Sequence, residues 1–154
     1  MKKLTLLVLL LLLAQLVFGQ GSNRRKTYRC YVIKLSKKFD RQGDFFYTKN
    51  TAQDTVNLLK SLINDGIREN EKLYGSRFLA KPIIIYCRTK NQYLKYANNN
   101  TAGTTWITSN KTYLVLWRGG LNLDVVAHEL CHAELTARGG FFTSLFSVPA
   151  LFDE

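Results

Sequence analysis

Residues 122–140 read NLDVVAHELCHAELTARGG, and this stretch decides how the chain is interpreted. Apolar residues recur in it at the spacing of an amphipathic helix: Leu123, Val126, Ala127, Leu130 and Leu135. Asn122 or Asp124 can cap the start of this helix. A basic last turn at Arg138, followed by two glycines, predicts that the helix stops at residues 139–140.

Both histidines of the chain lie in this helix, in the pattern His128-Glu129-Leu130-Cys131-His132. At about 100° per residue, the two imidazoles are about 40° and one turn apart, so both project from one face. Two imidazoles placed in this way can bind one Zn²⁺, and Glu129 beside them can take a proton from water. The alternative is a pair of helix histidines without a metal. Chance placement of the full H-E-x-x-H pattern is rare, so the sequence favours a zinc centre with Glu129 as general base.

A catalytic zinc site uses three protein ligands and keeps one position for water, so a third ligand is expected. Glu134 lies about 200° from His132 and faces away from the site, and Cys131 is better interpreted as a small core residue. Acidic residues at the C-terminus remain. The two glycines let the chain turn back, and a second helix opening at Pro149 would bring Asp153 or Glu154 to the metal.

At these residues the chain resembles the gluzincin branch of the zincin metallopeptidases. Gluzincins carry H-E-x-x-H on one helix and a glutamate ligand on a following helix, often within Pro-x-Trp-x-x-Glu-Gly. Residues 149–154 match that motif up to the glutamate, with Leu151 at the tryptophan position. The resemblance covers about residues 82–154. It implies that His128, His132 and Glu154 bind Zn²⁺, and that Glu129 acts on a peptide or protein substrate.

The order of elements predicts one α+β domain. Strands are expected at residues 27–36, 82–87, 104–108 and 112–117, and helices at 51–73, 89–96 and 122–138. Thr51-x-x-Asp54 resembles a capping start for the first helix, which should end near Gly75. The continuous apolar run 82–87 predicts a strand buried on both faces.

The resemblance adds more specific expectations about this fold. It implies a zincin-like N-terminal subdomain, in which a mixed sheet supports the active-site helix. Residues 112–117 would then form the edge strand along which an extended peptide lies. Gluzincins continue beyond the position of Glu154 into a further subdomain, so we expect that C-terminal subdomain to be largely missing.

The N-terminus predicts export. Two lysines precede an apolar run, and Val17 and Gly19 occupy the −3 and −1 positions of a signal peptide spanning residues 1–19. Residues 20–154 would form the mature domain in the periplasm or outside the cell. The alternative is a retained N-terminal membrane anchor, although the run is shorter than the roughly 20 apolar residues that a span needs.

The basic charge is interpreted in the light of export. The chain carries 22 Lys and Arg against 11 Asp and Glu, a net charge of +11 that falls to +9 when Lys2 and Lys3 are removed. An exported protein does not normally meet nucleic acid, so we expect no nucleic-acid partner. Electrostatic contact with an anionic envelope surface is the remaining interpretation.

Two further points bear on function. Three cysteines leave at least one thiol unpaired in a monomer, and Cys30 and Cys87 could pair if their strands are neighbours. The leading hypothesis is an exported zinc metallopeptidase. The alternatives are an inactive or truncated zincin-like protein that acts in binding, and a basic module that binds the envelope.

Overall fold

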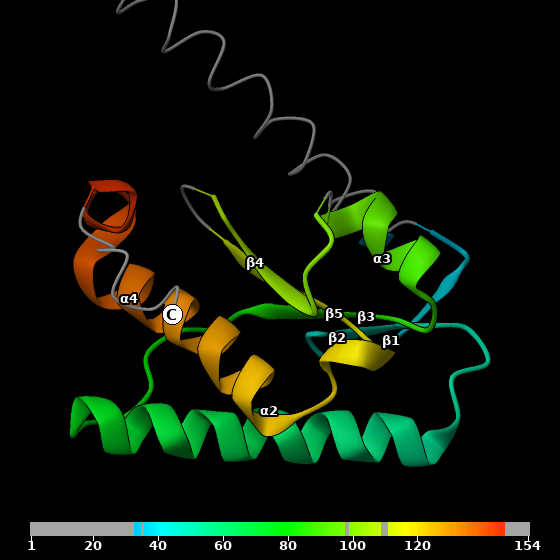
Figure 1. The fold of residues 1–154 in the computed structure, drawn as a ribbon, viewed down its shortest axis with the longest axis horizontal. Helices are drawn as coiled ribbons and strands as arrows, with labels where there is room; N and C mark the ends of the chain where they lie inside the picture. The colour runs from blue at the N-terminus through cyan, green and yellow to red at the C-terminus, as the bar shows by residue number, and fades with distance from the viewer. Residues whose placement is uncertain (1–32, 35, 98, 109–110, 147–154) are drawn as a thin grey trace, which may run out of the picture.

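The computed structural model describes residues 33–34, 36–97, 99–108 and 111–146, which form a five-stranded mixed sheet with helices on both faces (Figure 1). The sheet order is β1-β2-β3-β5-β4. β1 (Phe39–Gln42) and β2 (Phe45–Thr48) form an antiparallel hairpin. β2, β3 (Ile83–Cys87) and β5 (Thr112–Trp117) are parallel, and β4 (Gly103–Ile107) runs antiparallel to β5 at the edge. The predicted α+β class is confirmed.

The central strands bury both of their faces, as the apolar run predicted. All five residues of β3 are buried. Ile83, Ile85 and Cys87 join one core cluster, while Ile84 and Tyr86 join another on the opposite face. This alternation is the two-residue period of a strand, and it gives the sheet two separate cores.

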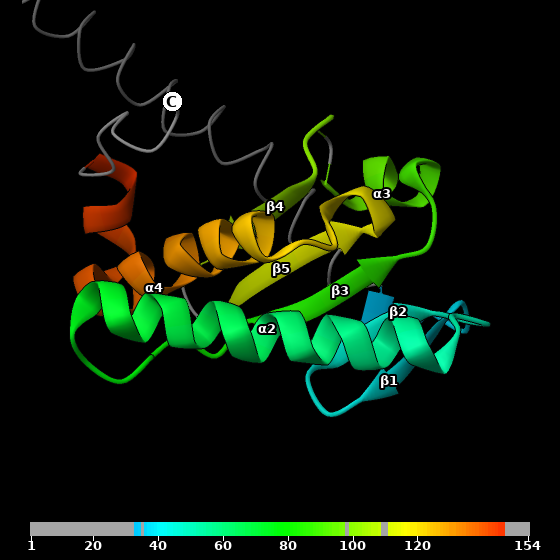
Figure 2. The same ribbon diagram turned by 60° about the horizontal axis from the view of Figure 1, so that its bottom comes forward.

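The helices cover these two cores. α2 (Gln53–Tyr74) and α4 (Leu123–Phe146) pack together on one face, and α3 (Lys90–Ala97) lies on the other (Figures 1 and 2). α2 ends at Gly75, which has a left-handed φ of 61° as predicted. A short 3-10 turn, η1 (Arg118–Gly120), connects β5 to α4.

Gly66 explains how closely α2 and α4 approach each other. A Cβ atom at this position would come within 2.9 Å of the Leu130 side chain and 3.3 Å of the Ala127 nitrogen. A glycine inside a helix normally lowers its stability. The structure shows that its missing side chain brings α4, with its histidines, against α2.

Several expectations about the elements were wrong. Ile33 and Lys34, placed by the sequence in a strand, are helical; residues 27–32 lie outside the described residues. α2 begins at the N-cap Ala52, which makes no side-chain capping bond, so the expected cap from Thr51 is absent. α4 does not stop at Gly139 but continues to Phe146, because the glycines keep helical backbone.

The predicted edge strand was also wrong. β5 lies between β3 and β4, so residues 112–117 are central and β4 is at the edge. Hydrogen bonds to the neighbouring strands occupy both sides of β5. Among the described strands, β4 is the edge at this side of the sheet. Among the described residues, no helix is both long enough and apolar enough to cross a membrane.

Candidate metal centre

The centre begins at the N-terminus of α4, which fixes the direction of the histidines. Asn122 Oδ1 accepts a hydrogen bond of 2.9 Å from the Val125 amide, so Asn122 is the capping residue of the two that the sequence allowed. Val126, Leu130 and Ala133 are fully buried against the sheet. Their burial turns the opposite face of α4 outward, and the histidines lie on that face.

The two imidazoles converge as the spacing predicted. His128 Nε2 and His132 Nε2 lie 3.0 Å apart, and the rings meet edge to face with their centroids at 4.7 Å. Two nitrogens bound to one tetrahedral Zn²⁺ at 2.0–2.1 Å would be about 3.3 Å apart. The observed separation is close to this value, and the contact is itself an imidazole hydrogen bond that a bound metal would replace.

Glu129 lies beside the pair, turned toward the edge strand. It is only 8% exposed, and its Oε2 accepts a hydrogen bond of 2.6 Å from the Thr105 hydroxyl of β4. The Glu129 carbonyl oxygen lies 2.8 Å from the same hydroxyl. No described residue donates to Oε1. Oε2 is thus held by a hydrogen bond from β4, and Oε1 is the oxygen that can accept a proton.

Burial sets the acidity of this carboxyl group. Desolvation raises the pKa of Glu129, and the Thr105 hydrogen bond and the nearby His128 oppose that rise. A carboxyl group of raised pKa is a stronger base when ionised. The environment therefore favours proton transfer at Glu129.

Thr105 and Gly103 belong to this site although the sequence did not indicate them. A Cβ atom at Gly103 would come within 3.1 Å of Glu129 Cγ, so a side chain there would displace the carboxylate. Both residues come from β4, about 25 positions before Glu129. Local patterns do not report such contacts. The H-bonding register of β4 against β5 would have been needed to find them.

Glu134 faces away from the histidines, as the helical geometry required. It is fully buried, and its carboxylate accepts hydrogen bonds from the Leu79 and Ala80 amides at 2.8 and 2.9 Å. Arg138 Nε lies 2.7 Å from the same carboxylate. Glu134 therefore anchors the segment after α2 to α4.

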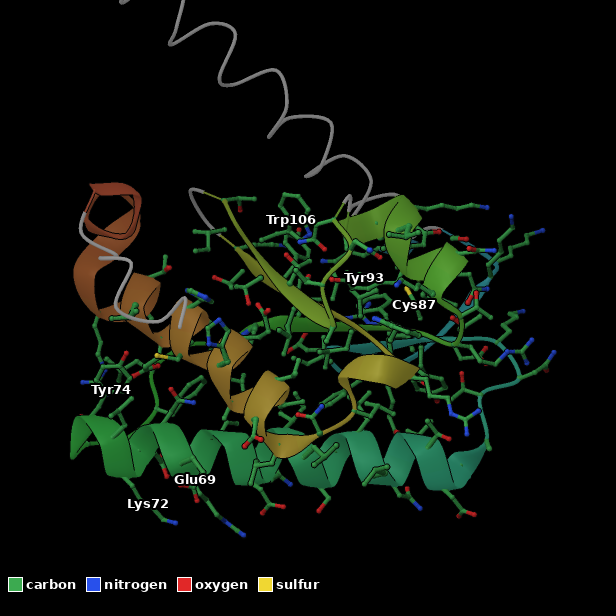
Figure 3. All side chains as sticks on the ribbon, viewed as in Figure 1. Glu69, Lys72, Tyr74, Cys87, Tyr93 and Trp106 are labelled. Carbon is green, nitrogen blue, oxygen red and sulfur yellow. The ribbon has the colours of Figure 1, made fainter. Side chains whose placement is uncertain are left out.

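Cys131 is half-buried where α4 faces α2, beside the two histidines. Its Sγ lies 3.3 Å from the Tyr74 hydroxyl, and Figure 3 shows Tyr74 reaching from the end of α2 toward α4. Cys131 also lines a pocket of about 190 Å³ with both histidines and with Glu69, Asn70, Leu73, Ala127 and Leu135. Cys131 is therefore not the small core residue that the sequence suggested, because it is only half-buried and lines this pocket.

Some predicted residues cannot be placed. Asp153 and Glu154, the candidates for the third ligand, lie outside the described residues, as does Cys30. Within the described part of the chain, no three His, Cys, Asp or Glu side chains form a metal-binding group. The described centre therefore contains two converging imidazoles and a neighbouring carboxylate.

The chain was compared with known proteins. No known protein family, curated protein or solved structure matches it.

Proposed function

We propose that this protein is an exported zinc-dependent metallopeptidase. The observation that carries the proposal is the convergence of His128 and His132, whose Nε2 atoms lie 3.0 Å apart beside the buried Glu129. His128 and His132 are two of the proposed ligands, and Glu154 is the third. A bound zinc supplies a Lewis acid that polarises a peptide carbonyl and lowers the pKa of water.

Glu129 carries the proton in the proposed reaction. Its Oε1 accepts a proton from the attacking water and passes it to the nitrogen of the leaving amine. Thr105 keeps Oε2 occupied and so fixes the direction of Oε1. The Thr105 hydroxyl thus acts as a positioning group for the base.

The edge strand supports an extended peptide substrate. Among the described strands, β4 pairs with β5 alone and forms one edge of the sheet. An extended peptide can add to such an edge by main-chain hydrogen bonds. Glu129 is hydrogen-bonded to this strand, which would place a peptide on β4 close to the base.

Metal content and hydrolysis of a quenched peptide library test the proposal together. We expect about one zinc per chain, lost in His132→Ala and weakened in Glu154→Ala. Glu129→Gln should retain zinc and lose at least about 100-fold in hydrolysis, since general-base catalysis typically contributes that much. Asp40→Asn is a matched control, because this exposed carboxylate on β1 lies outside the histidine pocket. Unchanged zinc content in His132→Ala would contradict the proposal.

A further inference from the structure

A second cavity lies far along the fold from the histidines, at the N-terminal end of α2. It has a volume of about 590 Å³, and its lining includes Tyr86, Arg88, Arg118, Thr51 and Thr55. Tyr86 and Arg88 come from the end of β3, and Arg118 follows β5 in η1. The carboxyl ends of parallel strands are a common place for ligands to bind in open sheets.

The charge of this cavity is positive and uncompensated. Arg88 and Arg118 are both exposed there, and no Asp or Glu lines the cavity. Neither guanidinium forms an ion pair with any described carboxylate. The one described side-chain hydrogen bond of Arg88 goes to the Asn50 carbonyl oxygen at 3.4 Å. Two guanidinium groups on one cavity favour an anion with several oxygens.

Tyr86 gives an independent indication of a ligand. Its side chain is only 2% exposed, yet its hydroxyl makes no hydrogen bond with any described residue. Burial raises the pKa of Tyr86, and the nearby Arg118 and Arg88 oppose that rise. The hydroxyl therefore stays protonated beside the two guanidinium groups. The hydroxyl is not among the enclosed polar atoms that lack a partner, so it is accessible from the cavity and can donate a hydrogen bond to a ligand there.

The start of α2 borders the cavity through Ala52 and Thr55, and its first turn also carries the exposed carboxylate of Asp54. Its N-cap is Ala52, which has no side chain that can accept from the first helical amides. Thr51 does not compensate, because its hydroxyl donates back to the Thr48 carbonyl oxygen. A helix N-terminus carries a partial positive charge that favours anions.

We propose that this cavity binds a phosphate group. Arg88 and Arg118 pair with the phosphate oxygens, and the Tyr86 hydroxyl donates a hydrogen bond to one of them. The cavity exceeds the size of a bare phosphate, and Leu58 and Leu121 line its remainder. The ligand class is accordingly a phosphate ester with an apolar body, either a soluble metabolite or a lipid headgroup. The proposal rests on different residues from the metal centre.

Calorimetric titration of the full chain with inorganic phosphate and with phenyl phosphate tests this inference. We expect saturable binding of both, tighter for phenyl phosphate. Arg118→Gln and Arg88→Gln should each weaken binding about tenfold or more, because each removes a charge-assisted hydrogen bond. Tyr86→Phe, which keeps the buried ring, should weaken it several-fold. Circular dichroism of each variant identifies losses that are due to misfolding.

Two controls separate this site from other sources of binding. Arg68→Gln removes the same charge from the exposed face of α2 and should leave phosphate affinity unchanged. His132→Ala should also leave it unchanged, which keeps the outcome distinct from that of the proposed peptidase. Equal weakening by Arg68→Gln and Arg118→Gln, or the absence of saturable binding, would overturn the proposal.

A vesicle-binding experiment distinguishes a lipid headgroup from a soluble phosphate ester. Vesicles of phosphatidic acid in phosphatidylcholine should bind through Arg118 and be displaced by phenyl phosphate if a lipid headgroup is the ligand. Phenyl phosphate binding without vesicle binding indicates a soluble ester. Vesicle binding that Arg118→Gln and Arg68→Gln reduce equally reflects only the general basic charge, and it would count against the cavity.

Discussion

At the scale of single residues, the best evidence for chemistry is the contrast between Glu129 and Glu134. Both are buried carboxylates on α4, five positions apart. The Glu134 carboxylate accepts hydrogen bonds from two backbone amides and from Arg138, so both of its oxygens have structural partners. Glu129 has a single hydroxyl donor, on one oxygen. A buried carboxylate with few partners is costly to keep ionised, which is typical of functional groups.

This cost predicts a pH-dependent effect of Glu129→Gln on the metal-free protein. The folded pKa of Glu129 is raised by burial, so its contribution to stability is complete below the unfolded value of about 4.3 and is lost as pH rises through the folded value. Glutamine stays neutral at every pH. We expect the variant to unfold at higher urea than the wild type at pH 7 and at the same urea near pH 4.

Urea titrations at the two pH values in EDTA measure this difference, with Glu69→Gln as an exposed control that shows no such trend. A stability difference of equal size at both pH values would show that Glu129 is not ionised at a cost in the folded protein.

At the scale of elements, residue patterns along the sequence predicted the helices and strands that depend on local interactions. The boundaries of α2, α3, β3, β4 and β5 follow from periodicity and turn residues. Thr89 and Gln92 exchange backbone-to-side-chain hydrogen bonds at the start of α3, which the sequence placed at residue 89. The order of strands in the sheet depends on long-range pairing. The sequence therefore did not show that β4 and not β5 lies at the edge. The hairpin of β1 and β2 was missed because its charged residues carry no clear alternation.

Glu134 links two elements, and this connection leads to a second prediction. Its carboxylate holds the Leu79 and Ala80 amides while Arg138 spans to the Arg77 carbonyl oxygen at 3.0 Å. Glu134→Ala removes the acceptor of these part-buried amides and leaves the Arg138 guanidinium without its carboxylate. A polar group left unsatisfied inside a protein costs about 1–3 kcal/mol. We expect a loss of about 2–4 kcal/mol in the free energy of unfolding. Hydrogen exchange should become faster at Leu79 and Ala80 in particular.

The control for this experiment is Glu69→Ala, which removes an exposed carboxylate paired with Lys72 and should change stability by well under 1 kcal/mol. Unchanged exchange at Leu79 and Ala80 in Glu134→Ala would mean that the segment after α2 is held by other contacts.

At the scale of the whole molecule, the histidine pair and the arginine cavity both border α2, but at different parts of this helix. The first is built where α4 packs against the second half of α2, and the second where α2 begins. The sequence revealed the first because its residues are neighbours on one helix. The second draws on β3, η1 and α2, which only the folded chain brings together.

Zinc should stabilise the whole fold, because a ligand that binds only the native state shifts the unfolding equilibrium by mass action. At a free zinc concentration about 100 times its Kd, the expected gain is about 2.7 kcal/mol in the free energy of unfolding. Urea denaturation with and without zinc measures it. His128→Ala and His132→Ala should each lose most of this gain, whereas Mg²⁺, which prefers oxygen ligands, should give none to the wild type. An equal gain in His132→Ala would place the zinc elsewhere and separate the converging imidazoles from metal binding.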